Sequence, residues 1–275
     1  MNRNMEKIPS KIMAEYAQTA DPQIYYIQPV QIRAGLSYLM GKRLFDLVFA
    51  CIGIVIFLIP MGVISVCVKL NSPGPFLFCQ ERLGKNGKPF LMYKFRSMYM
   101  DAENTGPRWA AENDGRVTSV GKVIRKFRLD ELPQLFNILK GEMSFVGPRP
   151  ERAFFYREFS SYIKGFEQRL KAVPGLTGLA QVCGGYDLKP EEKIVYDIFY
   201  MENRSFFYDL WIIAKTLGTV FNHQGARKNE YVVFSSLCNS PYHVRDATAG
   251  VVCQAVKATR TSCSRFCLFL FALFG

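Results

Sequence analysis

The sequence predicts a mixed α/β (α+β) protein in which a small body is attached to a membrane segment. Three observations predict this class. An uncharged apolar run covers residues 47–68, a strand–turn–strand pattern covers residues 76–98, and leucine and phenylalanine recur at helical spacing over residues 132–139. We divide the chain into a polar leader, a membrane segment, a mixed α/β body and a tail: residues 1–40, 41–70, 71–228 and 229–275.

The composition fits a folded protein with an anionic partner. Of the 275 residues, 49% are hydrophobic and 21% are charged, so the chain can bury a core. The net charge of +12 suits nucleic acids, anionic lipid headgroups and phosphorylated substrates alike. The sequence has no recognisable DNA- or RNA-reading motif, so we expect no nucleic-acid partner.

Cysteine and histidine usage indicates a reducing compartment. The eight cysteines form no CxxC pair, and the two histidines lie in no HExxH pattern, so a zinc site is not expected. The first 40 residues carry several charges and no continuous apolar core. We therefore expect no cleavable signal peptide.

The membrane segment has no charged side chain from Leu47 to Val68. As a straight helix this run would be about 33 Å long, close to the thickness of a hydrocarbon core. Pro60 interrupts the run, and positive charge flanks both ends, with Lys42 and Arg43 before it and Lys69 after it. A helix broken at Pro60 that returns to the same face and a kinked spanning helix fit these features equally well.

A hairpin is predicted next. Phe76–Arg82 and Phe90–Met98 are strand-like, and Gly84–Gly87 between them is a strong turn signal. On the second strand Lys94 and Arg96 share one face. Taken alone, these two cations are interpreted as a solvated basic face.

An adjacent acidic pair opens the next predicted helix. Its apolar face covers residues 132–139, with Asp130 as the expected N-cap, Pro133 in the first turn and Gly141 at the C-terminal stop. Asp130 and Glu131 would then lie where unpaired N–H groups and the helix dipole favour carboxylates and phosphates. The alternative is that Asp130 merely caps the helix and Glu131 merely complements its dipole.

Cations surround this acidic pair in the sequence. Those that precede it within eight positions are Lys122, Arg125, Lys126 and Arg128. After the helix, Arg149 lies between Pro148 and Pro150, which restrict the backbone and hold the guanidinium for bidentate phosphate binding. A carboxylate nucleophile, a metal-binding carboxylate and a fixed guanidinium together fit phosphoryl transfer. The chemistry predicts a phosphate site but not its substrate.

A series of motifs in order carries a family resemblance from about Lys42 to Arg227. The motifs are Lys42-Arg43-Leu44-Phe45-Asp46, the mid-segment Pro60, Tyr93-Lys94-Phe95-Arg96-Ser97-Met98, the run from Leu129 to Asn137, the run from Met143 to Pro150, the run from Pro174 to Val182, and Asp197-Ile198-Phe199-Tyr200. At these residues the chain resembles the bacterial sugar transferase family, the monotopic polyprenyl-phosphate phosphoglycosyl transferases.

The resemblance implies roles for individual residues. It implies that Asp130 is the catalytic nucleophile that forms an aspartyl–phosphosugar intermediate, and that Glu131 is the catalytic carboxylate that helps to hold Mg²⁺ on the diphosphate. Four further residues match substrate- or phosphate-binding positions: Lys94, Arg125, Arg149 and Asp197.

The resemblance also implies an activity and a place. A sugar 1-phosphate would pass from a UDP-sugar to polyprenyl (undecaprenyl) phosphate with release of UMP, in the first membrane step of bacterial glycan assembly. The body, with amphipathic interface helices, would sit on a re-entrant helix–break–helix anchor at the cytoplasmic face of the inner membrane, and a homo-oligomer is compatible with the sequence. The alternative is a catalytically idle membrane-attached protein that binds nucleotide-sugar or acts as a scaffold, although the intact Asp130–Glu131 pair favours an enzyme.

Two departures from the family pattern stand out. Many relatives have a cation before the Pro-Gly at residues 174–175, where this chain has Val173, and Arg169 or Lys171 nearby would have to replace it. The tail after residue 228 matches no recognised pattern.

A further amphipathic helix, predicted from residue 206, suits either the core or the membrane interface.

Overall fold

The computed structural model describes residues 17–21, 24–27, 29, 34–103, 114–183 and 188–221. The chain divides into two units, Met1–Lys228 and Asn229–Gly275, and all described residues belong to the first. The predictions for the tail and for the first 16 residues therefore lie outside the described residues. The mixed class is confirmed, because helices and short strands alternate along the body.

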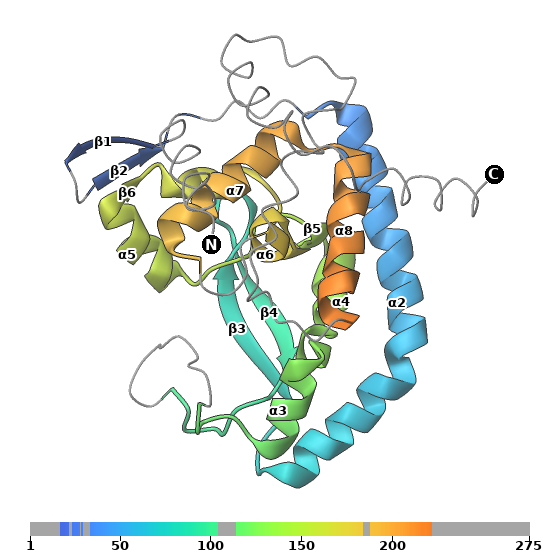
Figure 1. The fold of residues 1–275 in the computed structure, drawn as a ribbon. Helices are drawn as coiled ribbons and strands as arrows, with labels where there is room; N and C mark the ends of the chain where they lie inside the picture. Colours follow the sequence, from blue (N-terminus) through green and yellow to red (C-terminus); the bar gives the residue numbers. More distant parts are fainter. Residues whose placement is uncertain are drawn as a thin grey trace, which may run out of the picture. The chain divides into compact units, whose positions relative to one another are not determined.

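The membrane segment is a single helix, α2 (Leu36–Asn71). It begins earlier than predicted and continues through Pro60, although Figure 1 shows that it changes direction along its length. The helix interruption expected at Pro60 was wrong. A proline removes only one helical hydrogen bond and kinks a helix, and the apolar residues on both sides keep the helical conformation.

Both halves of α2 pack on the body. Ala50 lies in a core cluster with Leu135 and Ile138, whereas Met61 and Val68 lie in another with partners from the body. Most other apolar side chains of α2 are exposed, among them Val55 and Ile59. One stripe of the helix is therefore core and the rest is an apolar surface.

Polar bonds fasten both ends of α2 to the same body. Near the start, Arg43 donates to the carbonyl oxygens of Ile138 (2.7 Å) and Leu139 (2.8 Å), the last turn of α4. Just after the end, buried Arg96 donates to the carbonyl oxygens of Ser72 (2.7 Å) and Pro73 (2.6 Å). Arg96 thus does not belong to a solvated basic face.

The predicted hairpin is confirmed. Strands β3 (Leu77–Leu83) and β4 (Pro89–Phe95) pair antiparallel. The turn between them contains Asn86 and Gly87 at positive φ, 58° and 73°, which explains the strong local signal. The second strand ends at Phe95 rather than Met98, because the chain bends away to place Arg96 against the end of α2.

The acidic pair does not cap a helix. After α3 (Ser119–Lys126), Asp130 and Glu131 occupy a 3₁₀ turn, η2 (Leu129–Glu131), and helix α4 (Gln134–Lys140) begins later. Pro133 has no N–H, so the segment around it closes in i→i+3 turns instead of α-helical ones. The N-cap assignment of Asp130 was therefore wrong, whereas the stop at Gly141 is confirmed by its φ of 82°.

The remaining elements complete the body around this centre. They are β1 (Ala17–Asp21), β2 (Ile24–Ile27), β5 (Ser144–Val146), α5 (Ala153–Tyr162), β6 (Ile163–Lys164), η3 (Phe166–Lys171), β7 (Gly175–Thr177), α6 (Leu179–Cys183), α7 (Pro190–Asn203) and α8 (Phe206–Phe221). Strand β5 pairs parallel with β7, and β2 pairs antiparallel with β1 and parallel with β6. Part of the leader thus joins the body.

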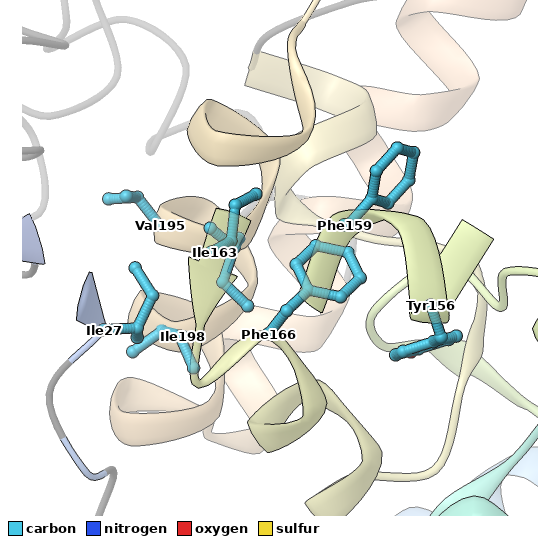
Figure 2. Packing of buried hydrophobic residues seen from close by; sticks show 8 residues of the cluster. Ile27, Tyr156, Phe159, Ile163, Phe166, Val195 and Ile198 are labelled. Atoms are coloured by element: carbon cyan, nitrogen blue, oxygen red, sulfur yellow. The ribbon is translucent and has the colours of Figure 1, made fainter. Parts of the chain in front are cut away.

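A buried apolar cluster joins the leader to α5 and α7, as Figure 2 shows. Its labelled members are Ile27, Tyr156, Phe159, Ile163, Phe166, Val195 and Ile198. Burial of each large apolar side chain contributes roughly 1.5–3 kcal/mol, so this cluster fixes α5, η3 and α7 to one another. These elements carry the residues that support the segment after β5 that contains Arg149, residues 147–150, which we call the arginine loop.

Apolar side chains also lie exposed on the body. Three of them are close in sequence to the acidic pair. They are Val123 in α3 (55% exposed), Phe127 just after α3 (39%) and Phe136 in α4 (41%). On α8, Tyr208 and Ile212 are buried whereas Phe207 is 78% exposed. The core packing expected for the helix from residue 206 is confirmed for one face, and its exposed apolar side chains leave insertion at the membrane interface a prediction.

Candidate active site

The acidic pair lies on a buried 3₁₀ turn, η2. Asp130 and Glu131 are each only 9% exposed. Arg128, which precedes the turn, has a φ of 58°, a left-handed conformation that costs a non-glycine residue about 1–2 kcal/mol. Such strained residues often occur at functional sites, where surrounding contacts hold them.

Two cations from distant elements converge on Glu131. Its Oε1 atom accepts from Nη2 of Arg149 at 2.5 Å and from Nζ of Lys94 at 3.1 Å. Lys94 comes from β4, and Arg149 comes from the loop after β5. The structure therefore brings together four of the predicted site residues, including Asp130.

The two neighbouring carboxyl groups have opposite pKa shifts. Burial alone would raise the pKa of Glu131, but Arg149 and Lys94 outweigh burial and hold it well below its usual range. Burial and the charge of Glu131 raise the pKa of Asp130 to about 6, and the nearby cations offset this only in part. Burial and Glu131 thus outweigh the cations at Asp130, although its carboxyl group is still mainly ionised at neutral pH.

Arg125 acts on Asp130 through its charge. It lies in the last turn of α3, and its positive charge lowers the pKa of Asp130. The pKa of Lys94 is lowered, because burial of its ammonium group outweighs the attraction of Glu131. Both cations therefore stand within electrostatic reach of the acidic pair, as predicted from their positions in the motifs.

Asp197 lies behind the arginine loop. Its Oδ2 accepts from Nε of Arg169 at 2.6 Å, and both side chains are buried. Nη2 of Arg169 in turn donates to the carbonyl oxygen of Arg149 at 3.0 Å. Asp197 thus reaches the site through Arg169, and its predicted substrate-binding role stays a prediction. Because Arg169 is committed to this buried pair, it does not replace the cation missing at Val173.

Three glycines allow the arginine loop to approach the neighbouring backbone. A Cβ atom on Gly147 would clash with the carbonyl oxygen of Val173 and the backbone of Gly175. A Cβ atom on Gly178 would clash with the carbonyl oxygen of Gly147. The amide of Gly147 donates to the carbonyl oxygen of Thr177 at 2.9 Å. The two motifs around Arg149 and Gly175 are thus one packed unit.

Sequence reasoning assigned no role to Asn137, which is fully buried. Its Oδ1 accepts from the amide of Tyr93 at 3.1 Å, and its Nδ2 donates to the carbonyl oxygen of Leu91 and to Glu142, both at 2.7 Å. These bonds fix α4 against β4 and so set Lys94 relative to Glu131. The only signal in the sequence is an amide inside an apolar helix face.

The sequence also did not reveal a cluster of charged side chains next to the arginine loop. Glu151 pairs with Arg82 at 3.4 Å and with Lys193 at 3.5 Å. Nη1 of Arg82 donates to the carbonyl oxygen of Pro150 at 3.2 Å. These residues come from β3, the arginine loop and α7, and no local pattern reveals that they meet.

The donor set suits a hard divalent cation shared with a substrate. Among the described residues, no group of three or more His, Cys, Asp or Glu side chains could hold a metal ion. Mg²⁺ commonly takes one or two carboxylates and completes its shell with substrate phosphates and water. Asp130 and Glu131 fit this pattern, because their two adjacent carboxylates supply oxygen ligands.

Comparison with known proteins places this geometry in context. The family model described as bacterial sugar transferase matches residues 37–223. A UDP-N-acetylgalactosamine-undecaprenyl-phosphate N-acetylgalactosaminephosphotransferase of Aeromonas hydrophila is 45% identical over 69% of this chain and 46% of its own length. Proteins named UDP-glucose:undecaprenyl-phosphate glucose-1-phosphate transferase are 40% identical in Klebsiella pneumoniae, over 67% of this chain and 41% of theirs. In Escherichia coli the protein of that name is 37% identical, over 70% of this chain and 42% of its own length. The chain thus spans less than half the length of each of these three relatives.

Proposed function

The chain belongs to the bacterial sugar transferase family, and on this basis we propose that it transfers a sugar 1-phosphate from a UDP-sugar to undecaprenyl phosphate, with release of UMP. The observation that supports this most directly is the site itself. Asp130 adjoins a Glu131 held by Lys94 and Arg149. A buried carboxylate beside fixed cations suits displacement at a phosphate.

The transfer proceeds in two displacements. First, an ionised Oδ atom of Asp130 bonds to the phosphorus that carries the sugar, and the bond from this phosphorus to the UMP oxygen breaks. UMP leaves with the electron pair. Next, an oxygen of undecaprenyl phosphate bonds to the same phosphorus and the Asp130 carboxylate is released. Two displacements avoid a direct collision between two anionic phosphates.

Several positive charges at the site would neutralise the negative charge of the donor diphosphate. Arg149 and Lys94 pair with Glu131, next to Asp130, and would neutralise charge on a donor diphosphate bound there. Glu131 and Asp130 would hold Mg²⁺ together with oxygens of the donor. The chemistry that Mg²⁺ supplies when bound is neutralisation of charge on the diphosphate.

The attachments of α2 support a re-entrant seat at the cytoplasmic face of a bacterial inner membrane. Arg43 at its start and Ser72 after its end are hydrogen-bonded to one charged body. A spanning helix would require this body to lie on both sides of a bilayer or inside it, which charged groups oppose. A bent helix that enters and returns on one face leaves the body in water.

A direct assay tests the proposed activity. The full chain in nanodiscs, supplied with undecaprenyl phosphate, Mg²⁺ and a panel of UDP-sugars, should release UMP and form a lipid-linked diphosphosugar. Binding of a UDP-sugar without UMP release from any member of the panel would favour an idle binding or scaffold protein instead.

The covalent step has its own test. Wild-type protein mixed with the active UDP-sugar and no lipid should gain the mass of one sugar phosphate, and Asp130→Asn should not. A variant Asp130→Asn that turns over within about tenfold of wild type would refute the covalent step in favour of direct transfer.

A further inference from the structure

A buried carboxylate outside the proposed mechanism connects α2 to α7 and α8. Asp209, in the first turn of α8, is 4% exposed. Its Oδ2 accepts from Nζ of Lys42 at 2.7 Å and from the hydroxyl of Tyr38 at 2.8 Å, both from α2. Its Oδ1 accepts from the hydroxyl of Tyr200 in α7 at 2.7 Å.

The hydroxyl of Tyr200 extends this connection to the arginine loop. Its oxygen lies 2.7 Å from Oδ1 of Asp209 and 3.2 Å from the carbonyl oxygen of Val146, within donating distance of both. Val146 ends β5, and Arg149 follows three positions later. A hydroxyl oriented by a buried carboxylate thus fixes the point from which the arginine loop departs.

A cap-only role does not explain this arrangement. An acidic residue in the first turn of α8 would complement the helix dipole from an exposed position. Asp209 is instead buried, and a buried carboxylate is retained without large cost only when its charge and lone pairs are satisfied. Lys42, Tyr38 and Tyr200 do so, and they come from two elements that are distant in the sequence.

We propose that Asp209 is a positioning residue: through Tyr200 it sets the position of the arginine loop, and through Lys42 and Tyr38 it makes that position depend on how α2 is seated. This inference rests on the proposed function, in which Arg149 serves the donor phosphate. The contacts run without a gap from Lys42 of the membrane helix to the loop that places Arg149 on Glu131. Figure 1 shows the elements concerned, with α8 beside α2.

The chain supplies a matched pair of substitutions. Tyr200→Phe removes the hydroxyl that links Asp209 to Val146 and keeps the ring. Tyr208→Phe is the control, because Tyr208 is also buried but its hydroxyl has no hydrogen-bond partner among the described residues. Lys42→Met tests the α2 end of the connection without touching the loop directly.

Two measurements on the full chain in nanodiscs test the proposal. Amide hydrogen exchange of the peptide over residues 144–150 reports on the loop itself. The amide hydrogen of Gly147 is hydrogen-bonded, and Pro148 and Pro150 have no amide hydrogen that could exchange. We expect at least about fivefold faster exchange in Tyr200→Phe and Lys42→Met, the loss expected for about one net hydrogen bond, and no change in Tyr208→Phe. The rate of UMP release in a single turnover should fall by about tenfold in the same two variants. The thermal midpoint of Tyr200→Phe should stay close to that of wild type, because Asp209 keeps Lys42 as its counter-charge, whereas Lys42→Met should also lower the thermal midpoint.

The outcomes separate the two levels of the argument. If Tyr200→Phe exchanges and releases UMP as Tyr208→Phe does, the positioning role of Asp209 is refuted. Faster exchange with an unchanged rate would also refute it, because the loop would then move without consequence. A wild-type protein that releases no UMP would instead refute the proposed transfer, and the exchange data would still decide whether Asp209 holds the loop.

Discussion

At the scale of single residues, two neighbouring carboxyl groups are prepared for different tasks. Lys94 and Arg149 keep the Glu131 carboxylate charged, whereas burial and Glu131 itself raise the pKa of Asp130 to about 6. A carboxylate with a raised pKa is the stronger nucleophile of the two, and one with a lowered pKa is the more reliable counter-charge. These opposite pKa shifts favour Asp130 as the attacking group in the mechanism that we propose.

The pH dependence should show this difference. Because attack requires ionised Asp130, whose pKa is raised to about 6, kcat/KM for the UDP-sugar should fall as the pH drops through about 6. Arg125→Gln removes a charge that lowers this pKa and should move the acidic limb to higher pH. The control Lys126→Gln, at the next position of α3, should leave it in place. A rate that stays flat from about pH 8 to about pH 5 would contradict the assignment.

Neutralising Glu131 should weaken both the ion pairs and the response to Mg²⁺. Glu131→Gln leaves the partly buried Lys94 and Arg149 without their counter-charge, so we expect kcat to fall by at least about a hundredfold. The Mg²⁺ concentration for half-maximal rate should rise, and EDTA should abolish the wild-type rate. Glu158→Gln, an exposed change on α5, is the control. Full wild-type turnover in EDTA would exclude the metal role.

At the scale of elements, the arginine loop is held by close backbone packing in addition to the side chains of Tyr200 and Arg169. Gly147 and Gly178 lie where neighbouring backbone leaves no room for a Cβ atom. This explains why the motif around Arg149 and the motif around Gly175 belong together although they lie apart in the sequence. Rigidity of Arg149 comes from this packing as well as from its flanking prolines.

A methyl group at this crossing should therefore be costly. We expect Gly147→Ala to lower the free energy of unfolding by about 1–3 kcal/mol and to reduce transfer activity, because the loop must shift away from Gly175. Gly218→Ala in α8 is the control, since nothing lies within 4 Å of its added Cβ atom. Thermal unfolding of both variants checks this, and equal stability of the two would contradict the packing argument.

The same scale shows what the sequence can predict. The β3–β4 hairpin and the stop at Gly141 depend on local turn chemistry, so they were predicted correctly. The start of α4 was missed because a capping aspartate and a 3₁₀ turn before a proline look alike in sequence. The ion pairs of Glu131 were anticipated only as nearby charges, because their geometry depends on packing between β4 and α4.

Contacts between distant segments could not be predicted at all. Strand β2 of the leader pairs with β6, and Asp197 meets Arg169, without any periodic or spacing signal that links them. Asp209 likewise appeared in the sequence as one acid in an amphipathic helix. Its role depends on the position of α2, which only the fold supplies.

At the scale of the whole molecule, the anchor and the described body form a single packed structure. The core clusters along α2 and the polar bonds at its two ends fix the anchor relative to the site. Exposed apolar side chains of α2 and α8 provide the surface that a bilayer would cover.

Labelling of the helix ends tests the re-entrant seat. Single cysteines at Gly41 and Asn71, introduced after removal of the native cysteines, should both be protected from an impermeant thiol reagent applied outside intact cells. Both should react once the inner face is opened, as the control for accessibility. Labelling of either site from outside would establish a spanning helix and overturn the re-entrant arrangement.

Exposed Val123, Phe127 and Phe136 around the acidic turn have a consequence for how substrates meet. If these side chains rest at the level of the lipid headgroups, the acceptor need not leave the bilayer, and its search for Asp130 takes place in a plane while the nucleotide-sugar arrives from a volume. The rate should then follow the number of acceptor molecules per unit of membrane area rather than per litre. Diluting undecaprenyl phosphate with inert phospholipid, at constant total amount, should therefore slow the transfer.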